Sequence, residues 1–146
     1  MTDLFRADDI NRMMEHLRIM GAQFGITFAD RPFLSNSRPA LLAAEFAREQ
    51  GKFQEFHYGL FSAYFSQGLD IGNMEILSGI ARNASLDEKA MVDSIESGRY
   101  QVQLEKARED AGRRGITGVP TFFIGDKKSI VGAQSLDVFR KTLHSR

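Results

Sequence analysis

The stretch from Gly115 to Gln134 constrains the fold most, because it carries the strongest strand signal in the chain. Thr121 to Ile124 is a run of β-branched and aromatic residues, and Ile130 and Val131 form a second, β-branched run. A short polar turn, Gly125 to Lys128, separates the two runs, and its glycine adopts positive φ readily. This pattern predicts a β-hairpin. Pro120 precedes the first strand, where a missing N–H group is tolerated.

The remainder of the sequence has the periodicity of helices, with apolar residues three and four positions apart. A Ser85-Leu86-Asp87-Glu88 capping box predicts one helix start, and Asn73 is expected to cap another helix. Leu136, Phe139 and Leu143 are expected on the inner face of the last helix. The expected helices cover Ala7–Gly21, about 36–51, about 53–66, 73 onward, 85–96, 100–115 and 135 onward.

Composition narrows the class of protein. The 146 residues suit one domain with a sizeable core, and no internal repeat or low-complexity segment interrupts them. The formal net charge is zero, so there is no general electrostatic argument for nucleic acid or an anionic membrane as a partner. No apolar run reaches membrane-spanning length, and Met1 to Met20 carries charges throughout, unlike a signal peptide. We therefore expect a cytoplasmic protein.

Several motifs together resemble a known family. Gly118-Val119-Pro120-Thr121-Phe122, the hairpin, Val131-Gly132-Ala133-Gln134 and a final amphipathic helix are similar to the C-terminal half of DsbA-like thioredoxin-fold proteins. The segment from Asn36 to Gly51 and the phenylalanine-rich Phe53 to Phe65 resemble the helical insert of the FrnE-type, dithiol–disulfide isomerase-like branch. The resemblance covers the chain from about Gly25 onward.

The resemblance implies a fold and its limits. We expect a mostly helical α/β protein, an incomplete thioredoxin-like fold that forms a single DsbA-like domain over residues 1–146. It would comprise an N-terminal helix (1–24), a helical insert (36–98) and a thioredoxin-like C-terminal half (99–146), without the family's N-terminal βαβ unit. In that family the Val119-Pro120 bond is cis, and Val119, Pro120 and Thr121 face a peptide or thiol substrate.

The resemblance also implies oxidoreductase or isomerase activity, which needs a cysteine thiolate. The sequence contains no cysteine, so we expect no thiol redox activity from this chain on its own. A non-catalytic binding or assembly module is the alternative, and a relative of the glutathione-dependent 2-hydroxychromene-2-carboxylate isomerases is a further one. A thiol-dependent activity assay separates the first two.

Other residue types give no stronger signal for a site. The three histidines lack the spacing of metal ligands, and no phosphate-binding glycine loop is present, so no metal or cofactor is expected. His57 is interpreted as a half-buried histidine bonded to the backbone, and His16 as a surface or interface residue.

Two strands alone make a marginal sheet, and an unpaired apolar strand edge favours pairing with another chain. We therefore expect a homodimer. The edge would be covered by a second copy, or by the Met-rich first helix within the same subunit or by exchange between subunits.

Overall fold

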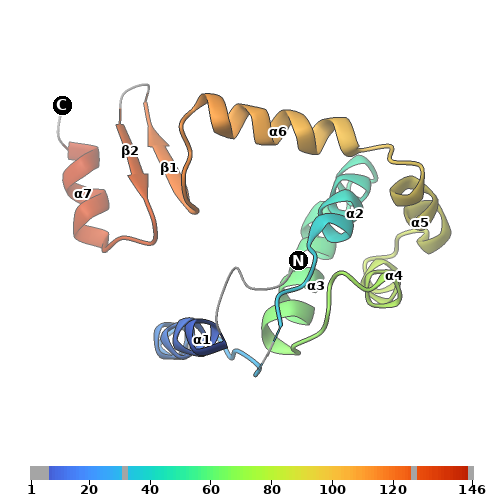
Figure 1. Ribbon diagram of the computed structural model, residues 1–146, viewed down its shortest axis with the longest axis horizontal. Coiled ribbons are helices and arrows are strands. Elements are labelled where there is room, and N and C mark those ends of the chain that lie inside the picture. Colours follow the sequence, from blue (N-terminus) through green and yellow to red (C-terminus); the bar gives the residue numbers. More distant parts are fainter. Residues whose placement is uncertain (1–6, 31–32, 126–127, 145–146) are drawn as a thin grey trace. The chain divides into compact units, whose positions relative to one another are not determined.

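The computed structural model describes residues 7–30, 33–125 and 128–144. The chain divides into a helical unit within residues 1–104 and a hairpin unit within residues 105–146, and α6 (Gln101–Arg113) runs across their boundary (Figure 1). The predicted class agrees with these residues: the described part of the chain is mostly helical, with one two-stranded sheet. Residues 1–6 of the expected N-terminal segment, Arg31 and Pro32, and Asp126 and Lys127 of the expected turn lie outside the described residues.

The helical unit is built around one apolar core. Its elements are α1 (Ala7–Ala22), α2 (Arg38–Glu49), α3 (Phe53–Phe61), a π-helical turn η1 (Ser62–Ser66), α4 (Met74–Asn83) and α5 (Glu88–Glu96). Phe56, Leu77 and Met91 are the largest side chains with no exposed surface, and they come from α3, α4 and α5. Small residues of α2, such as Ala43 and Ala47, are also fully buried and let neighbouring helices approach closely.

The helix starts test the capping predictions. The Asn73 side chain accepts a hydrogen bond from the Glu75 amide at 2.8 Å, which confirms it as the cap of α4. The predicted capping box at Ser85 is wrong. Asp87 is the cap of α5 and accepts from the Ala90 amide at 2.9 Å, whereas Ser85 has a φ of +58° and belongs to the preceding turn. Serine and aspartate are both common helix caps, and Ser85 and Asp87 lie two positions apart, so the sequence pattern alone did not show which of them caps α5.

The predicted helix over residues 53–66 is interrupted. It is α-helical to Phe61 and then makes the π-helical turn, in which the Gln67 amide donates to the Ser62 carbonyl at 3.0 Å. His57 lies between the rings of Phe53 and Phe61, at centroid distances of 5.0 and 4.6 Å. The expected backbone hydrogen bond of His57 is wrong: ring stacking holds the side chain, and within the described part of the chain its nitrogens have no hydrogen-bond partner.

The hairpin unit contains the predicted strands. β1 (Thr121–Ile124) pairs antiparallel with β2 (Lys128–Val131), with Thr121 opposite Val131, and α7 (Leu136–His144) lies alongside the hairpin (Figure 1). The ring of Phe139 packs edge-on against Phe122 at 5.0 Å, as an inward-facing residue should. Leu136 and Leu143 are 63% and 64% exposed, so the expectation that both face inward is wrong.

Candidate functional site

The loop before β1 holds the three residues predicted to face a substrate. The Val119-Pro120 peptide bond is cis, the geometry that the family resemblance implies. The Val119 side chain is 89% exposed, Pro120 is exposed, and Thr121 is half-buried at the start of β1. The structure therefore brings the three residues together on an accessible loop.

Hydrogen bonds tie this loop to its own hairpin. The Gly132 amide donates to the Pro120 carbonyl at 2.7 Å, and the Thr121 hydroxyl donates to the Gly118 carbonyl at 2.6 Å. Gly132 has a φ of +84°, a conformation that glycine adopts without strain. Because its proton is used within the loop, the Thr121 hydroxyl offers a substrate only its acceptor capacity. Val119, Pro120 and the backbone are then the parts of the loop that are open to a substrate.

The surroundings of the loop are apolar and cationic. Among the described residues β1 pairs with β2 alone, so its second edge carries backbone donors and acceptors. Phe122 and Phe123 on this strand are 41% and 45% exposed, and the Arg114 guanidinium lies 5.5 Å from the Phe123 ring centroid. Backbone groups beside exposed aromatic rings are suited to an extended polypeptide, which pairs along the edge and places side chains against the rings.

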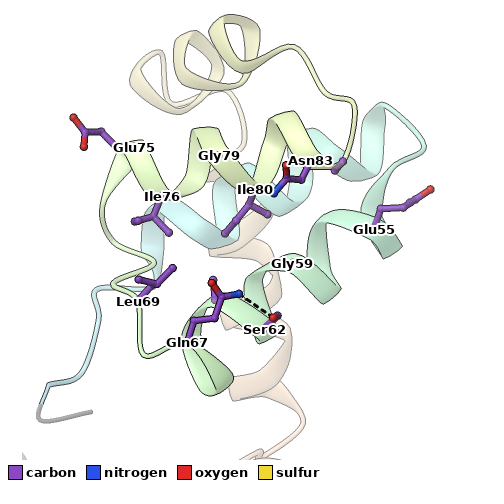
Figure 2. Close-up of a pocket in the computed structure, with 12 residues that line it drawn as sticks. Glu55, Gly59, Ser62, Gln67, Leu69, Glu75, Ile76, Gly79, Ile80 and Asn83 are labelled. Atoms are coloured by element: carbon purple, nitrogen blue, oxygen red, sulfur yellow. Dashed lines mark hydrogen bonds between the residues drawn. The ribbon is translucent and has the colours of Figure 1, made fainter. Parts of the chain in front are cut away.

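The helical unit has a separate pocket of about 380 Å³ between α3–η1 and α4. Figure 2 shows Ile76 and Ile80 reaching toward it from α4, with Asn83 beside them. The side-chain amide nitrogen of Gln67 donates a hydrogen bond to the Ser62 hydroxyl, and the two atoms lie 3.0 Å apart. Figure 2 also shows Glu55 and Glu75 on opposite sides of the pocket.

A hydrogen bond from its own backbone amide lowers the pKa of Glu55, and the nearby Lys52 contributes to the same shift. This pocket offers a ligand neutral hydrogen-bonding groups and an apolar wall, with carboxylates only at its margins.

No group of three or more histidine, aspartate and glutamate side chains in the part of the chain that the structure describes is placed to hold a metal ion. Within the same residues, no helix combines the length and the apolarity needed to cross a bilayer.

Comparison with known proteins establishes the family. The family model of the DSBA-like thioredoxin domain matches residues 4–144, so this chain belongs to the DSBA-like thioredoxin domain family. The match begins earlier in the chain than the resemblance, which covered residues from about Gly25.

Two curated proteins are similar to part of this chain. The chain is 36% identical over 99 residues to the uncharacterised protein YwbO of Bacillus subtilis (strain 168). The aligned segment covers 67% of this chain and 49% of YwbO. The chain is also 31% identical over 85 residues to the 2-hydroxychromene-2-carboxylate isomerase of Sphingobium xenophagum, covering 58% of this chain and 44% of the isomerase. The chain thus spans about half the length of the curated relatives it matches.

Among solved structures, a probable DsbA oxidoreductase from Streptomyces coelicolor has the same fold. The two structures superpose with a TM-score of 0.81 at 20% sequence identity. The superposed region covers 95% of this chain and 61% of the Streptomyces chain. At that identity the likeness establishes the fold alone.

Proposed function

We propose that this chain is the substrate-binding part of a DsbA-like oxidoreductase or isomerase. In this proposal Val119, Pro120 and Thr121 face a polypeptide or thiol substrate, and the chain by itself carries out no thiol–disulfide exchange. The observation that carries the proposal is the exposed loop of Val119, which leads directly into a strand that pairs on one side only among the described residues, in a member of the DSBA-like family.

The chemistry explains why the chain needs a thiol from elsewhere. In thiol–disulfide exchange a thiolate attacks one sulfur of a disulfide, forms a new S–S bond and displaces the other sulfur as a thiolate, which takes up a proton. The 146 residues contain no cysteine, so none of their side chains supplies the attacking thiolate. The loop and the strand edge are left with binding and orienting the substrate.

The first experiment measures activity. Purified chain is mixed with insulin and reduced glutathione, and insulin reduction is followed by turbidity, with a cysteine-containing thioredoxin as the positive control. We expect the same rate with the chain as with buffer. Turnover above buffer, in preparations free of contaminating redox enzymes, would refute the claim of inactivity.

The second experiment measures binding. An unfolded, cysteine-free polypeptide is titrated into labelled chain, and backbone amide shifts are followed by NMR. We expect shifts centred on residues 119–124, and we expect Val119→Asp to weaken them because it places a charge on the apolar contact surface. Val102→Asp is the matched control, since Val102 is 56% exposed on α6. Equal weakening by both variants would exclude the loop as the binding surface.

The non-catalytic alternative uses the same strand edge for assembly. Within the described residues β1 pairs with β2 alone, and Phe122 and Phe123 of β1 are exposed, which favours pairing with a second copy around a twofold axis. Light scattering at micromolar concentration should then give twice the chain mass of 16.4 kDa. A monomer mass, with stability unchanged on dilution, would contradict the dimer.

The similarity to a 2-hydroxychromene-2-carboxylate isomerase supports the further alternative of a glutathione-dependent isomerase. Titration with glutathione tests it, and an absence of binding at millimolar concentration would remove it. The proposal includes a cytoplasmic location, which fractionation of cells expressing the full gene product tests.

A further inference from the structure

Charge is unevenly distributed between the two units of the chain. The whole sequence has a formal net charge of zero, but residues 105–146 contain nine lysines and arginines against five aspartates and glutamates. The hairpin unit therefore carries a formal charge of +4, and residues 1–104 carry the balancing −4. Because a charged surface attracts partners of the opposite sign, the hairpin unit favours an acidic substrate over a basic one.

Two arginines and one carboxylate lie at the end of α6. Arg113 donates a hydrogen bond to Asp110 and lowers the pKa of this carboxyl, and the charge of Arg114 contributes less to the same shift. Arg114 makes no ion pair and no side-chain hydrogen bond with any residue that the structure describes. Its guanidinium lies 5.5 Å from the centroid of the Phe123 ring. A guanidinium without a carboxylate partner among the described residues is thus held directly beside β1.

Phe123 lies on the accessible face of the hairpin. Successive side chains of a strand point to opposite faces, and the ring of Phe122 packs on Phe139 of α7. Phe123 therefore points to the face away from that contact, together with Val131, which pairs with Thr121. Phe123 and Val131 are 45% and 48% exposed. This face is open to the side chains of a polypeptide that pairs with β1.

A polypeptide on the second edge of β1 would place a side chain near Arg114. Residues directly opposite each other on paired strands point to the same face, with Cβ atoms roughly 5 Å apart. The residue opposite Phe123 would therefore lie within reach of the guanidinium beside that ring. In strand addition the main-chain hydrogen bonds supply affinity, and alternate side chains supply specificity. A carboxylate at this position forms charge-assisted hydrogen bonds with a guanidinium, whereas a lysine is repelled.

We propose that Arg114 is a specificity-determining residue, which selects an extended polypeptide that carries a glutamate or aspartate opposite Phe123 and apolar residues on either side. The apolar neighbours point to the other face, where Phe122 is 41% exposed. This inference rests on the substrate-binding function proposed for residues 119–124, and it adds the chemical class of the substrate.

The test compares three blocked, cysteine-free peptides, Thr-Val-Xaa-Val-Thr, in which Xaa is glutamate, glutamine or lysine. Each is titrated into isotope-labelled chain at low ionic strength, and backbone amide shifts are followed by NMR up to about 10 mM peptide. The glutamate peptide should bind about three- to five-fold more tightly than the glutamine peptide, as for one exposed ion pair, and the lysine peptide should bind least. Salt at about 1 M should abolish these differences, because the Debye length falls to about 3 Å.

Arg114→Gln removes the guanidinium and should bind the glutamate and glutamine peptides equally. Arg108→Gln is the matched control and should keep the preference, because it removes the same charge from an exposed arginine of α6. Arg114→Lys keeps the charge without the planar fork and should keep part of the preference. A role of Arg114 only in complementing the end of α6 would lower thermal stability in Arg114→Gln and leave the order of the three peptides unchanged.

Several results would overturn the inference and leave the proposed function standing. These are equal binding of the three peptides, tightest binding of the lysine peptide, a preference that survives in Arg114→Gln, or a preference that Arg108→Gln removes equally. Binding of an unfolded, cysteine-free polypeptide at residues 119–124 without binding of any of the peptides would have the same meaning. An absence of shifts with the polypeptide and the peptides would refute the proposed function as well. Because the unmodified chain already ranks the peptides, a variant that fails to fold does not prevent a decision.

Discussion

Replacing Tyr100 by phenylalanine removes one oxygen from a hydrogen-bonded group that joins distant parts of the helical unit. The Tyr100 side chain is 3% exposed, and its hydroxyl donates to Glu49 Oε2 at 2.7 Å. Arg99 donates to the other oxygen of the same carboxylate at 2.6 Å. Glu49 ends α2 and Tyr100 directly precedes α6, so the group connects residues 51 positions apart.

The magnitude follows from the partners. A hydrogen bond to a charged group contributes about 1.5–3 kcal/mol. Glu49 is 43% exposed and keeps Arg99 and water as partners in the variant, so the loss falls at the lower end of that range. We expect Tyr100→Phe to reduce the free energy of unfolding by about 1.5 kcal/mol at neutral pH.

The pKa of Tyr100 predicts how this difference changes with pH. Burial, then the hydrogen bond to Glu49, then the charge of Glu49 raise its pKa from 10.0 to about 12. Because the folded-state pKa lies above the unfolded value, the stabilisation is fully present below pH 10 and is lost as the pH rises through 12. A shift of this size corresponds to roughly 2–3 kcal/mol. Tyr100→Phe lacks this titration, so its deficit should shrink between pH 10 and 12.

Guanidinium unfolding of both proteins at pH 7, 9 and 11 measures the effect, with Tyr58→Phe as a control for a solvent-exposed tyrosine. In a double-mutant cycle with Glu49→Gln, the two changes should be strongly non-additive. A loss below about 0.5 kcal/mol at pH 7, within the range of surface substitutions, or a deficit that is the same at all three pH values, would refute this account of the group.

Three further substitutions test the helical unit by chemical unfolding. Gly79→Ala should stabilise it by about 0.5–1 kcal/mol, because a Cβ there meets nothing within 4 Å inside α4; destabilisation would contradict this. Gly59→Ala should instead lower the free energy of unfolding by about 1–3 kcal/mol, because its Cβ would lie 2.7 Å from Ile80 Cγ2 in the core. An unchanged free energy of unfolding would show that α3 and α4 move apart at little cost. Asp87→Ala should cost about 0.5–2 kcal/mol through the lost cap of α5, whereas Ser85→Ala should not remove that cap.

Local chemistry was enough to predict several elements. β-Branched and aromatic residues at 121–124 and 130–131, separated by a glycine turn, predicted the hairpin in its observed place. Asn73 predicted the start of α4, because a cap acts on amides only two or three residues away. The family resemblance, which rested on several motifs, led to the correct fold.

The sequence by itself determined the hairpin, the helices and the lack of any cysteine thiolate, because each depends on residue type or on neighbours a few positions away. Only the tertiary structure decided which apolar residues are buried: Phe139 packs on Phe122, while Leu136 and Leu143 of the same helix are exposed. Only the tertiary structure joined Tyr100 to Glu49, 51 positions away in the sequence. These features depend on contacts between elements, and helical periodicity marks an apolar face without specifying what covers it.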